Sequence, residues 1–184
     1  MTHLRKLTMT GRRGGNDLQT PGAALTPLLR YIPQGWTIWE CCAGKGNLVF
    51  AARRADYTVV ASDIAKGTIG DRVDFLRDDF SGHYDCIVTN PPYRTKQRFV
   101  ERCYELGRPW ALLLPVGVLG NAWAQRLFAE YGMKILLLDR RVNFLAGRSG
   151  SWFSSAWYTY GLPLPSKIVY GRYVPADLPR RGGR

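Results

Sequence analysis

Four consecutive residues, Asn90-Pro91-Pro92-Tyr93, combine an amide, a rigid backbone and an aromatic ring directly after a short apolar run. Neither proline can donate a hydrogen bond to a neighbouring strand, so a strand predicted over Asp85–Thr89 must stop there. The amide is then held in a fixed position, and the Tyr93 ring offers a flat surface for stacking. These residue types could form a working site. A rigid turn without a ligand is the alternative, because Asn-Pro turns are common.

Basic residues follow this stretch at once, and they fit a polyanionic partner. Arg94, Lys96 and Arg98 stand close behind Tyr93. The whole chain has 26 Lys+Arg against 14 Asp+Glu, a formal net charge of +12, with a pI near 9.9. This balance points to nucleic acid, whose phosphates the three side chains are expected to contact. A solvated helix face is the alternative interpretation for these three residues.

A second candidate site lies at the glycine-rich stretch WECCAGKGNL. Gly44 and Gly46 stand between a predicted strand and a predicted helix, where glycines let the backbone turn tightly and approach a ligand. Asp63 comes 23 residues after Glu40 and ends the next strand. A carboxylate there can accept hydrogen bonds from both ribose hydroxyls of a nucleoside. Position 49 is Val, not the third glycine of a dinucleotide fingerprint, which argues against NAD and pyrophosphate groups. A nucleoside without phosphates and a turn without a ligand both stay open.

The elements that position these residues are short apolar runs separated by amphipathic stretches of helical length. Strands are predicted over Thr37–Cys42, Tyr57–Ser62, Val73–Leu76, Asp85–Thr89, Trp110–Leu114, Met133–Leu138 and Ala156–Tyr160, with Ile168–Tyr173 continuing the last as a hairpin. Helices are predicted over Asn47–Ala55, Lys96–Leu106 and Ala122–Tyr131. This alternation is typical of βαβ units, so we expect an α/β fold with a mostly parallel sheet.

In such sheets ligands bind beyond the carboxyl ends of the strands. Gly44, Asp63, Asp79 and Asn90 all stand at or just after predicted strand ends. We therefore expect these residues to share one rim of the sheet and to form one site.

The length of 184 residues suits one domain, expected over residues 16–176. Residues 1–15 and 177–184 are rich in Gly and Arg, so flexible basic tails are expected there. The four cysteines form no CxxC pair, which predicts neither a metal site nor a disulfide framework. No apolar run is long enough to predict a membrane span, and the N-terminus has no signal-peptide core. A reduced cytoplasmic setting fits these features, and nothing in the sequence predicts a particular oligomeric state.

Taken together, these motifs resemble S-adenosylmethionine-dependent amino-methyltransferases, and among them the N6-adenine DNA methyltransferases. The matching stretches cover roughly residues 20–163. QTP at residues 19–21 is similar to the upstream motif that helps hold the methionine end of the cofactor. WECCAGKGNL, SDI and DDF are similar to the first three motifs, and NPPY to the catalytic motif. The later run ALLLPVGVLG…LF…RRVNF…SSAWYTYG resembles the compact phage and prophage type.

The resemblance implies a Rossmann-like class I methyltransferase fold, with a mostly parallel seven-stranded sheet flanked by helices, in a bacterial or phage-infected cell. It implies S-adenosyl-L-methionine as the cofactor, bound by Thr20, Pro21, Glu40, Cys41, Ala43, Gly44, Gly46, Asp63, Ile64, Asp79 and Phe80. Asp79 would face the adenine amino group of the cofactor, and Phe80 would pack on that ring. Phe144, in RRVNF, would close the pocket of the target base opposite Tyr93. A simple core aromatic is the alternative for Phe144.

The resemblance also implies the reaction. The N6 amine of adenine is a poor nucleophile, because its lone pair is delocalised into the ring. The Asn90 side-chain carbonyl and the Pro91 backbone carbonyl would accept its N–H groups, draw the nitrogen toward sp³ and free the lone pair. Tyr93 would stack on the base once it has left the duplex. The sulfonium methyl group is already activated, so no strong general base is needed.

Other substrates share this chemistry. The same motif serves enzymes that methylate RNA bases and protein glutamine side chains, since all present a planar amino group. RNA is the first alternative to DNA, whereas the high positive charge fits a protein substrate less well. A catalytically silent nucleic-acid-binding module is a further class, and the intact Asn90, Asp63 and Gly44 argue against it. No separate target-recognition domain is visible, so we expect little or short sequence specificity.

Overall fold

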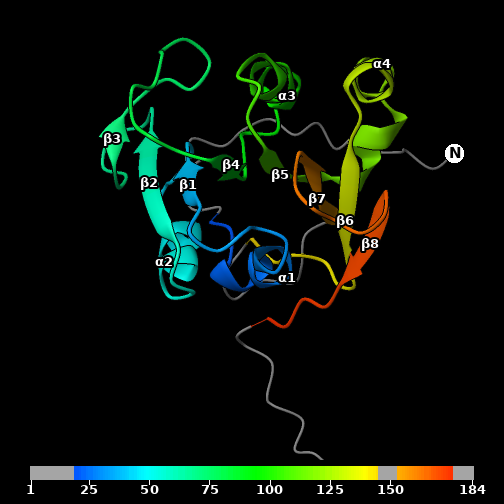
Figure 1. Cartoon of the computed structure of the whole chain (residues 1–184), viewed down its shortest axis with the longest axis horizontal. Coiled ribbons are helices and arrows are strands. Elements are labelled where there is room, and N and C mark those ends of the chain that lie inside the picture. Colours follow the sequence, from blue (N-terminus) through cyan, green and yellow to red (C-terminus); the bar gives the residue numbers. More distant parts are fainter. Residues whose placement is uncertain (1–18, 145–152, 176–184) are drawn as a thin grey trace, which may run out of the picture.

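The computed structural model describes residues 19–144 and 153–175 (Figure 1). The tails predicted over residues 1–15 and 177–184 lie outside the described residues. The described elements are, in chain order, η1 (Gly22–Ala24), α1 (Thr26–Leu29), β1 (Thr37–Glu40), α2 (Asn47–Arg53), β2 (Thr58–Asp63), β3 (Asp71–Arg72), β4 (Cys86–Thr89), α3 (Lys96–Glu105), β5 (Trp110–Pro115), η2 (Val116–Gly120), α4 (Ala122–Tyr131), β6 (Lys134–Leu138), β7 (Ser155–Tyr160) and β8 (Ile168–Gly171).

The strands form a sheet in the order β3-β2-β1-β4-β5-β7-β6-β8. The five strands β1 to β5 pair in parallel, and β6 pairs in parallel with β8. β7 runs antiparallel to both of its neighbours, β5 and β6. Helices α1 and α2 lie on one side of the sheet, and α3 and α4 lie on the other (Figure 1). The expected α/β fold with a mostly parallel sheet is thus confirmed, with eight described strands in place of seven.

The strand expected over Val73–Leu76 is wrong, because those residues form a turn. The Asp74 carboxylate accepts a hydrogen bond from the Leu76 N–H at 3.0 Å, and the Asp78 carboxylate accepts one from the Asp74 N–H at 2.7 Å. Acidic side chains thereby satisfy the N–H groups that a strand ladder would need. The short β3 lies just before this turn and takes the edge position beside β2.

The hairpin expected from β7 into Ile168–Tyr173 is also wrong. β8 pairs with β6 in parallel, with Leu138 opposite Gly171. β5 and β6 occupy both edges of β7, so β8 cannot pair with it and takes the free edge of β6 instead. This pairing supplies the eighth strand.

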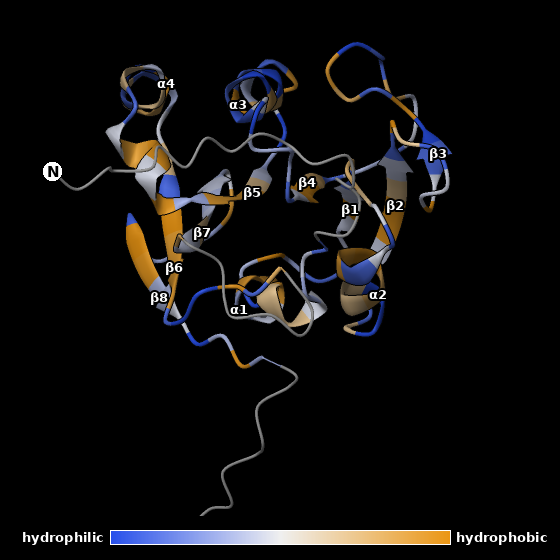
Figure 2. Ribbon diagram, turned by 180° about the vertical axis from the view of Figure 1, so that it is seen from behind, coloured by the Kyte–Doolittle hydropathy of each residue, from blue (hydrophilic) through white to orange (hydrophobic). Residues whose placement is uncertain are grey.

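The core has two parts, one on each side of the sheet. One packs α1 and α2 against the sheet and includes the buried Trp157, whose indole N–H donates to the Ala24 carbonyl at 2.9 Å. The other packs α3 and α4 around the buried Trp39 and Trp110. Full burial of one aliphatic or Phe side chain in such a core stabilises the folded state by about 1.5–3 kcal/mol. Figure 2 shows apolar colours along β6 and largely hydrophilic colours on α3 and β3. Among the described residues, no helix has the length and apolarity to cross a membrane.

The parallel strands place their carboxyl ends on one rim of the sheet. Glu40 ends β1, Asp63 ends β2 and Thr89 ends β4 on this rim. β7 runs the other way, so its first residue, Ser155, lies here beside Pro115, the last residue of β5. The rim therefore gathers the chain segments in which the sequence predicts a site.

Candidate active site

The glycine-rich turn after β1 is fixed by the carboxylate that ends β2. Gly44 and Gly46 have φ angles of +52° and +86°, in the left-handed region that favours glycine. A Cβ on Gly46 would lie 2.4 Å from the side chain of Ile69. The Asp63 carboxylate accepts hydrogen bonds from the Gly44 N–H at 2.9 Å and from the Ala65 N–H at 2.8 Å. The turn and the acidic residue predicted to bind ribose are therefore one structural unit.

The Gln19 side chain of the QTP segment contacts this turn. The Gln19 side-chain carbonyl accepts a hydrogen bond from the Lys45 N–H at 3.0 Å, and it would lie 2.9 Å from a Cβ on Gly44. Pro21 precedes η1 and its carbonyl accepts from the Ala24 N–H at 2.9 Å. Gln19 did not enter the predicted site, although the QTP motif was a signal for it.

Glu40 is a buried acid at the base of the same turn. Its carboxylate accepts a hydrogen bond from the Cys42 N–H at 3.0 Å. Burial raises the pKa of Glu40 to about 8, against smaller opposing effects of the Thr89 hydroxyl and the Cys42 N–H. The negative charge of the neighbouring Asp63 makes a smaller contribution to this raised pKa. Glu40 thus holds its proton in the folded protein at neutral pH.

Glu40→Gln should flatten the pH dependence of stability. In wild type the folded protein holds this proton between pH 4.5 and about 8, whereas the unfolded chain releases it. The free energy of unfolding should then fall by up to about 1.4 kcal/mol per pH unit as the pH rises through this window. Glutamine cannot ionise and can still accept from the Cys42 N–H. Urea denaturation at several pH values measures the slope, with the exposed Glu130→Gln as the control that keeps it. An unchanged slope in Glu40→Gln would place the titrating group elsewhere.

Thr20 holds the Asn90 amide from across the site. The Asn90 side-chain NH₂ donates to the Thr20 hydroxyl at 2.8 Å, and Thr20 is only 7% exposed. The other end of the amide, the Asn90 Oδ1 atom, is buried and has no hydrogen-bond partner. A buried acceptor without a partner is rare and costs about 1–3 kcal/mol. The arrangement leaves one oriented acceptor for a donor that is not part of the chain.

Tyr93 lies in a small aromatic group beside this amide. Its ring centroid is 6.3 Å from that of Phe144 and 5.5 Å from that of Phe153, both nearly perpendicular to it. Burial raises the pKa of Tyr93 to about 12. The Ser155 hydroxyl is close enough to lower this pKa by a smaller amount, yet neither hydroxyl meets the geometry of a hydrogen bond. The structure thus brings Phe144 to Tyr93, and it adds Phe153 and Ser155, which the sequence had not assigned to the site.

The backbone of the NPPY turn is held by the residues that follow it. The Thr95 N–H donates to the Pro92 carbonyl at 3.0 Å. The Lys96 ammonium donates to the Tyr93 carbonyl, also at 3.0 Å. Lys96 therefore supports the turn, whereas Arg94 and Arg98 are exposed.

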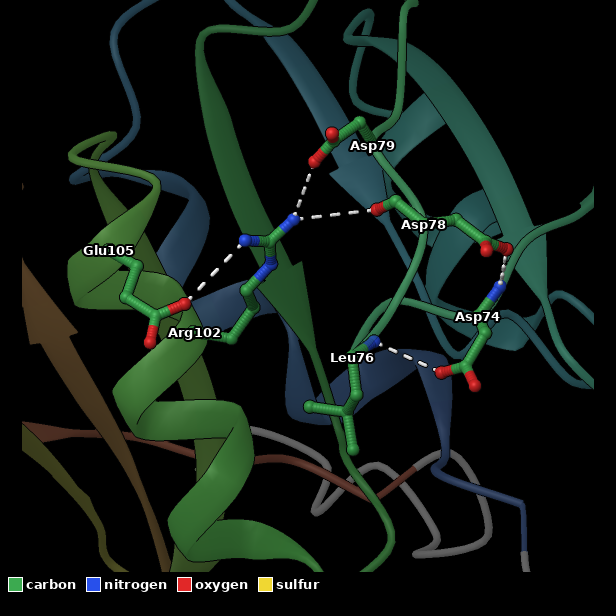
Figure 3. Close-up of polar contacts among 6 residues, drawn as sticks. All are labelled: Asp74, Leu76, Asp78, Asp79, Arg102 and Glu105. Carbon is green, nitrogen blue, oxygen red and sulfur yellow. Dashed lines mark hydrogen bonds and ion pairs between the residues drawn. The ribbon is translucent and has the colours of Figure 1, made fainter.

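The DDF segment lies in the loop before β4, opposite Arg102 of α3 (Figure 3). The Asp79 carboxylate is 99% exposed and lies 3.0 Å from the Arg102 guanidinium, which also contacts Glu105 at 3.5 Å. Phe80 stacks on Trp39, with ring centroids 4.4 Å apart and planes inclined by 17°. Asp79 is thus paired with an arginine that the sequence had not assigned to the site.

The remaining residues predicted to bind the cofactor border the glycine-rich turn. Cys41 and Ala43 are buried, and the Ala43 N–H donates to the Ser62 carbonyl at 3.0 Å. Ile64 is 57% exposed directly after Asp63, so it offers an apolar surface at the rim.

Comparison with known protein families and with curated protein sequences gives no match. Solved structures do match. The modification subunit of a putative type I restriction enzyme from Vibrio vulnificus has a TM-score of 0.58 at 14% identity, over 90% of this chain and 49% of that one. This chain thus spans about half of that subunit.

Two further structures match over most of this chain. A putative class I S-adenosylmethionine-dependent methyltransferase from Listeria monocytogenes has a TM-score of 0.59 at 14% identity, over 89% of this chain and 68% of that one. A putative RNA methyltransferase from Pyrococcus horikoshii has a TM-score of 0.54 at 15% identity, over 75% and 80%. These likenesses show that the chain has the Rossmann-like fold of class I methyltransferases.

Proposed function

We propose that this protein transfers the methyl group of S-adenosylmethionine to the exocyclic N6 amine of adenine in DNA, with little or short sequence specificity. The observation that carries the proposal is the Asn90 amide. Its NH₂ end is fixed by Thr20, and its buried oxygen has no partner, at the rim of a class I methyltransferase fold. An oriented acceptor is what a planar amine needs before it can attack a methyl group.

The cofactor would lie on the β1–β2 side of the rim. S-adenosylmethionine supplies an activated methyl group, and its sulfonium and ammonium groups are positively charged. Residues 63–85 hold six of the 14 acidic residues of the chain, so this side suits a cation. The Asp63 carboxylate uses two acceptor positions on backbone N–H groups and has about four in all, which leaves capacity for ribose hydroxyls. Gly44 and Gly46 would let the backbone approach the ligand, and Phe80 would pack on its adenine ring, with Ile64 beside it.

The target base would lie between the cofactor and the aromatic group around Tyr93. The Asn90 and Pro91 carbonyls would accept the two N–H groups of the amine, so that its lone pair leaves the ring and becomes nucleophilic. Tyr93 would stack on one face of the base, which has to leave the duplex to reach it. Phe144, nearly perpendicular to Tyr93, would contact the edge of the base. The exposed Arg94 and Arg98 would contact the flanking phosphates.

Mapping of modified bases on a plasmid of varied sequence tests this proposal. The expected result is N6-methyladenine at many sites that share at most a few neighbouring bases, because few side chains of this small domain can reach base edges. A long required sequence would contradict the low specificity. Methylation of RNA but not of the plasmid would move the substrate to RNA.

Thr20→Val should lower the rate of methyl transfer by about 3- to 10-fold, the effect of one lost hydrogen bond of about 0.5–1.5 kcal/mol. Valine has nearly the shape of threonine but cannot accept from the Asn90 NH₂ group, so the amide loses its fixed orientation. Thr20→Ser should restore most of the rate, because the hydroxyl is retained. Single-turnover methyl transfer at saturating cofactor measures the effect. Equal rates for Thr20→Val and wild type would mean that the hydrogen bond does not orient the amide.

A further inference from the structure

We propose that Arg140, Arg141 and Arg172 form a second phosphate-binding surface, on the far side of the Asn90–Tyr93 site from Arg94 and Arg98. One nucleic-acid strand would then be held on both sides of the target base. This inference rests on the proposed function and names how its substrate is held. We call the three residues the β6–β8 arginine surface.

Sheet topology places this surface on the same rim as the site. β7 is antiparallel to both β5 and β6, so β6 runs parallel to β5 and also to β4, and its carboxyl end lies on the rim where Asn90 follows β4. β8 is parallel to β6, with Leu138 opposite Gly171. Arg172 follows β8, and Arg140 and Arg141 closely follow β6. The two segments therefore leave the sheet side by side.

The backbone beneath these arginines is firmly held. The Asp139 N–H donates to the Gly171 carbonyl at 3.0 Å, and the Asp139 carboxylate accepts from the Tyr173 N–H at 2.8 Å. Val142 and Tyr173 are 0% and 1% exposed, so their side chains anchor both segments in the core. A surface on anchored backbone loses little conformational entropy when it binds.

The three arginine side chains are free to contact a ligand. All three residues are exposed, and none forms an ion pair with another described residue. The acidic neighbour, Asp139, already accepts a backbone hydrogen bond. Exposed guanidinium groups without a carboxylate partner are suited to bidentate contacts with phosphate.

The surface lies close to the candidate base pocket. Phe144 comes three residues after Arg141, so their Cα atoms are at most about 11 Å apart, the reach of three extended residues. The Phe144 ring in turn lies 6.3 Å from the Tyr93 ring. Arg94 follows Tyr93 directly in the sequence. Arginines from two distant parts of the chain thus stand close in sequence to the two rings.

The distribution of charged residues along the chain favours binding of a polyanion at the β4–β8 half of the rim. Residues 63–85, beside the predicted cofactor site, hold six acidic and three basic residues. Among the described residues from 139 on, residues 139–144 and 153–175, one is acidic and four are basic. A phosphodiester backbone is repelled by the first segment and attracted by the second. The strand is therefore directed across the β4–β8 half of the rim.

A charge-matched pair of double variants tests the surface. Arg140→Ala/Arg141→Ala should weaken binding of a labelled single-stranded oligonucleotide about tenfold at physiological salt. It should also reduce the slope of log K against log salt by about 1.4, the contribution of two lost phosphate contacts. The control Arg30→Ala/Arg54→Ala removes the same charge from the ends of α1 and α2. These helix ends come shortly before β1 and β2 begin, whereas the site lies where the strands end. Fluorescence anisotropy across a salt series measures both. An equal loss in the two double variants, or no loss in either, would overturn the proposal.

Two oligonucleotides with the adenine at opposite ends test whether the two arginine surfaces lie on opposite sides of the target base. Two oligonucleotides carry one adenine, at the 5′ end of the first and at the 3′ end of the second. Arg140→Ala/Arg141→Ala should impair binding of only one of them, and Arg94→Ala/Arg98→Ala should impair binding of the other. If both double variants impair the same oligonucleotide, the surfaces do not flank the base and the inference is wrong. These are binding measurements, so they decide the question whether or not methyl transfer is found.

Discussion

Asn90→Ala is expected to lower methyl transfer at least about a hundredfold, the effect of removing one preorganised polar group from a reacting centre. Affinity for S-adenosylmethionine should stay nearly unchanged, because the predicted cofactor contacts come from the turn after β1 and the end of β2. The amide acts on the target amine through its buried, unpartnered oxygen. Single-turnover transfer of a tritiated methyl group measures the rate, and isothermal titration measures cofactor affinity.

A matched control for this substitution is Asn121→Ala, at the start of α4, where its side chain forms no cap hydrogen bond. It should retain the wild-type rate. Substantial turnover by a folded Asn90→Ala protein would mean that the NPPY stretch is only a rigid turn. Loss of cofactor affinity together with turnover would instead show that Asn90 supports the cofactor site.

Asp63→Ala should abolish measurable cofactor binding and should also destabilise the protein by about 1–3 kcal/mol for each N–H group left buried without a partner. The carboxylate accepts from the Gly44 and Ala65 N–H groups, so its removal loosens the turn as well as the predicted ribose contact. Asp63→Asn can keep only one of these acceptors and should be intermediate. Isothermal titration with S-adenosylmethionine and urea denaturation give the two quantities.

The control for this second prediction is Asp71→Ala. Asp71 is an exposed acid on the edge strand β3, where it is paired with Ser62. Its substitution therefore removes the same charge as Asp63→Ala, close to the same turn. Its cofactor affinity should match wild type. Equal affinity in Asp63→Ala and wild type would show that the ribose site has been assigned to the wrong strand end.

The rim could be predicted from the sequence because it depends on local signals. Short apolar runs bounded by Gly, Asp or Pro mark the ends of buried strands, and parallel pairing then brings those ends together. Gly44, Asp63 and Asn90 follow this logic, and the structure places them on one rim. Asp79, expected there as well, does not follow a strand and pairs with Arg102 of α3 instead. The Val73–Leu76 run failed because two aspartate side chains capture the backbone N–H groups, an effect that apolar patterning does not register.

The contacts within the site depend on packing between distant segments, which no local pattern encodes. The hydrogen bond between Thr20 and Asn90 joins residues 70 positions apart and exists because the segment before η1 meets the residue that follows β4. The pairing of Asp79 with Arg102 likewise depends on how the loop before β4 lies against α3. The parallel pairing of β8 with β6 is also non-local, and it alone places Arg172 beside Arg140.

The proposed function requires that the amine held by Asn90 belongs to adenine. The most direct test is methyl transfer from tritiated S-adenosylmethionine to two DNA duplexes, one that contains adenine and one in which every adenine is absent, followed by digestion to nucleosides. The proposed function predicts label in the adenine-containing duplex alone, recovered as N6-methyldeoxyadenosine. Equal labelling of the adenine-free duplex would move the target to another amino group, with cytosine N4 the first candidate, and no labelling of either duplex would contradict DNA methylation altogether.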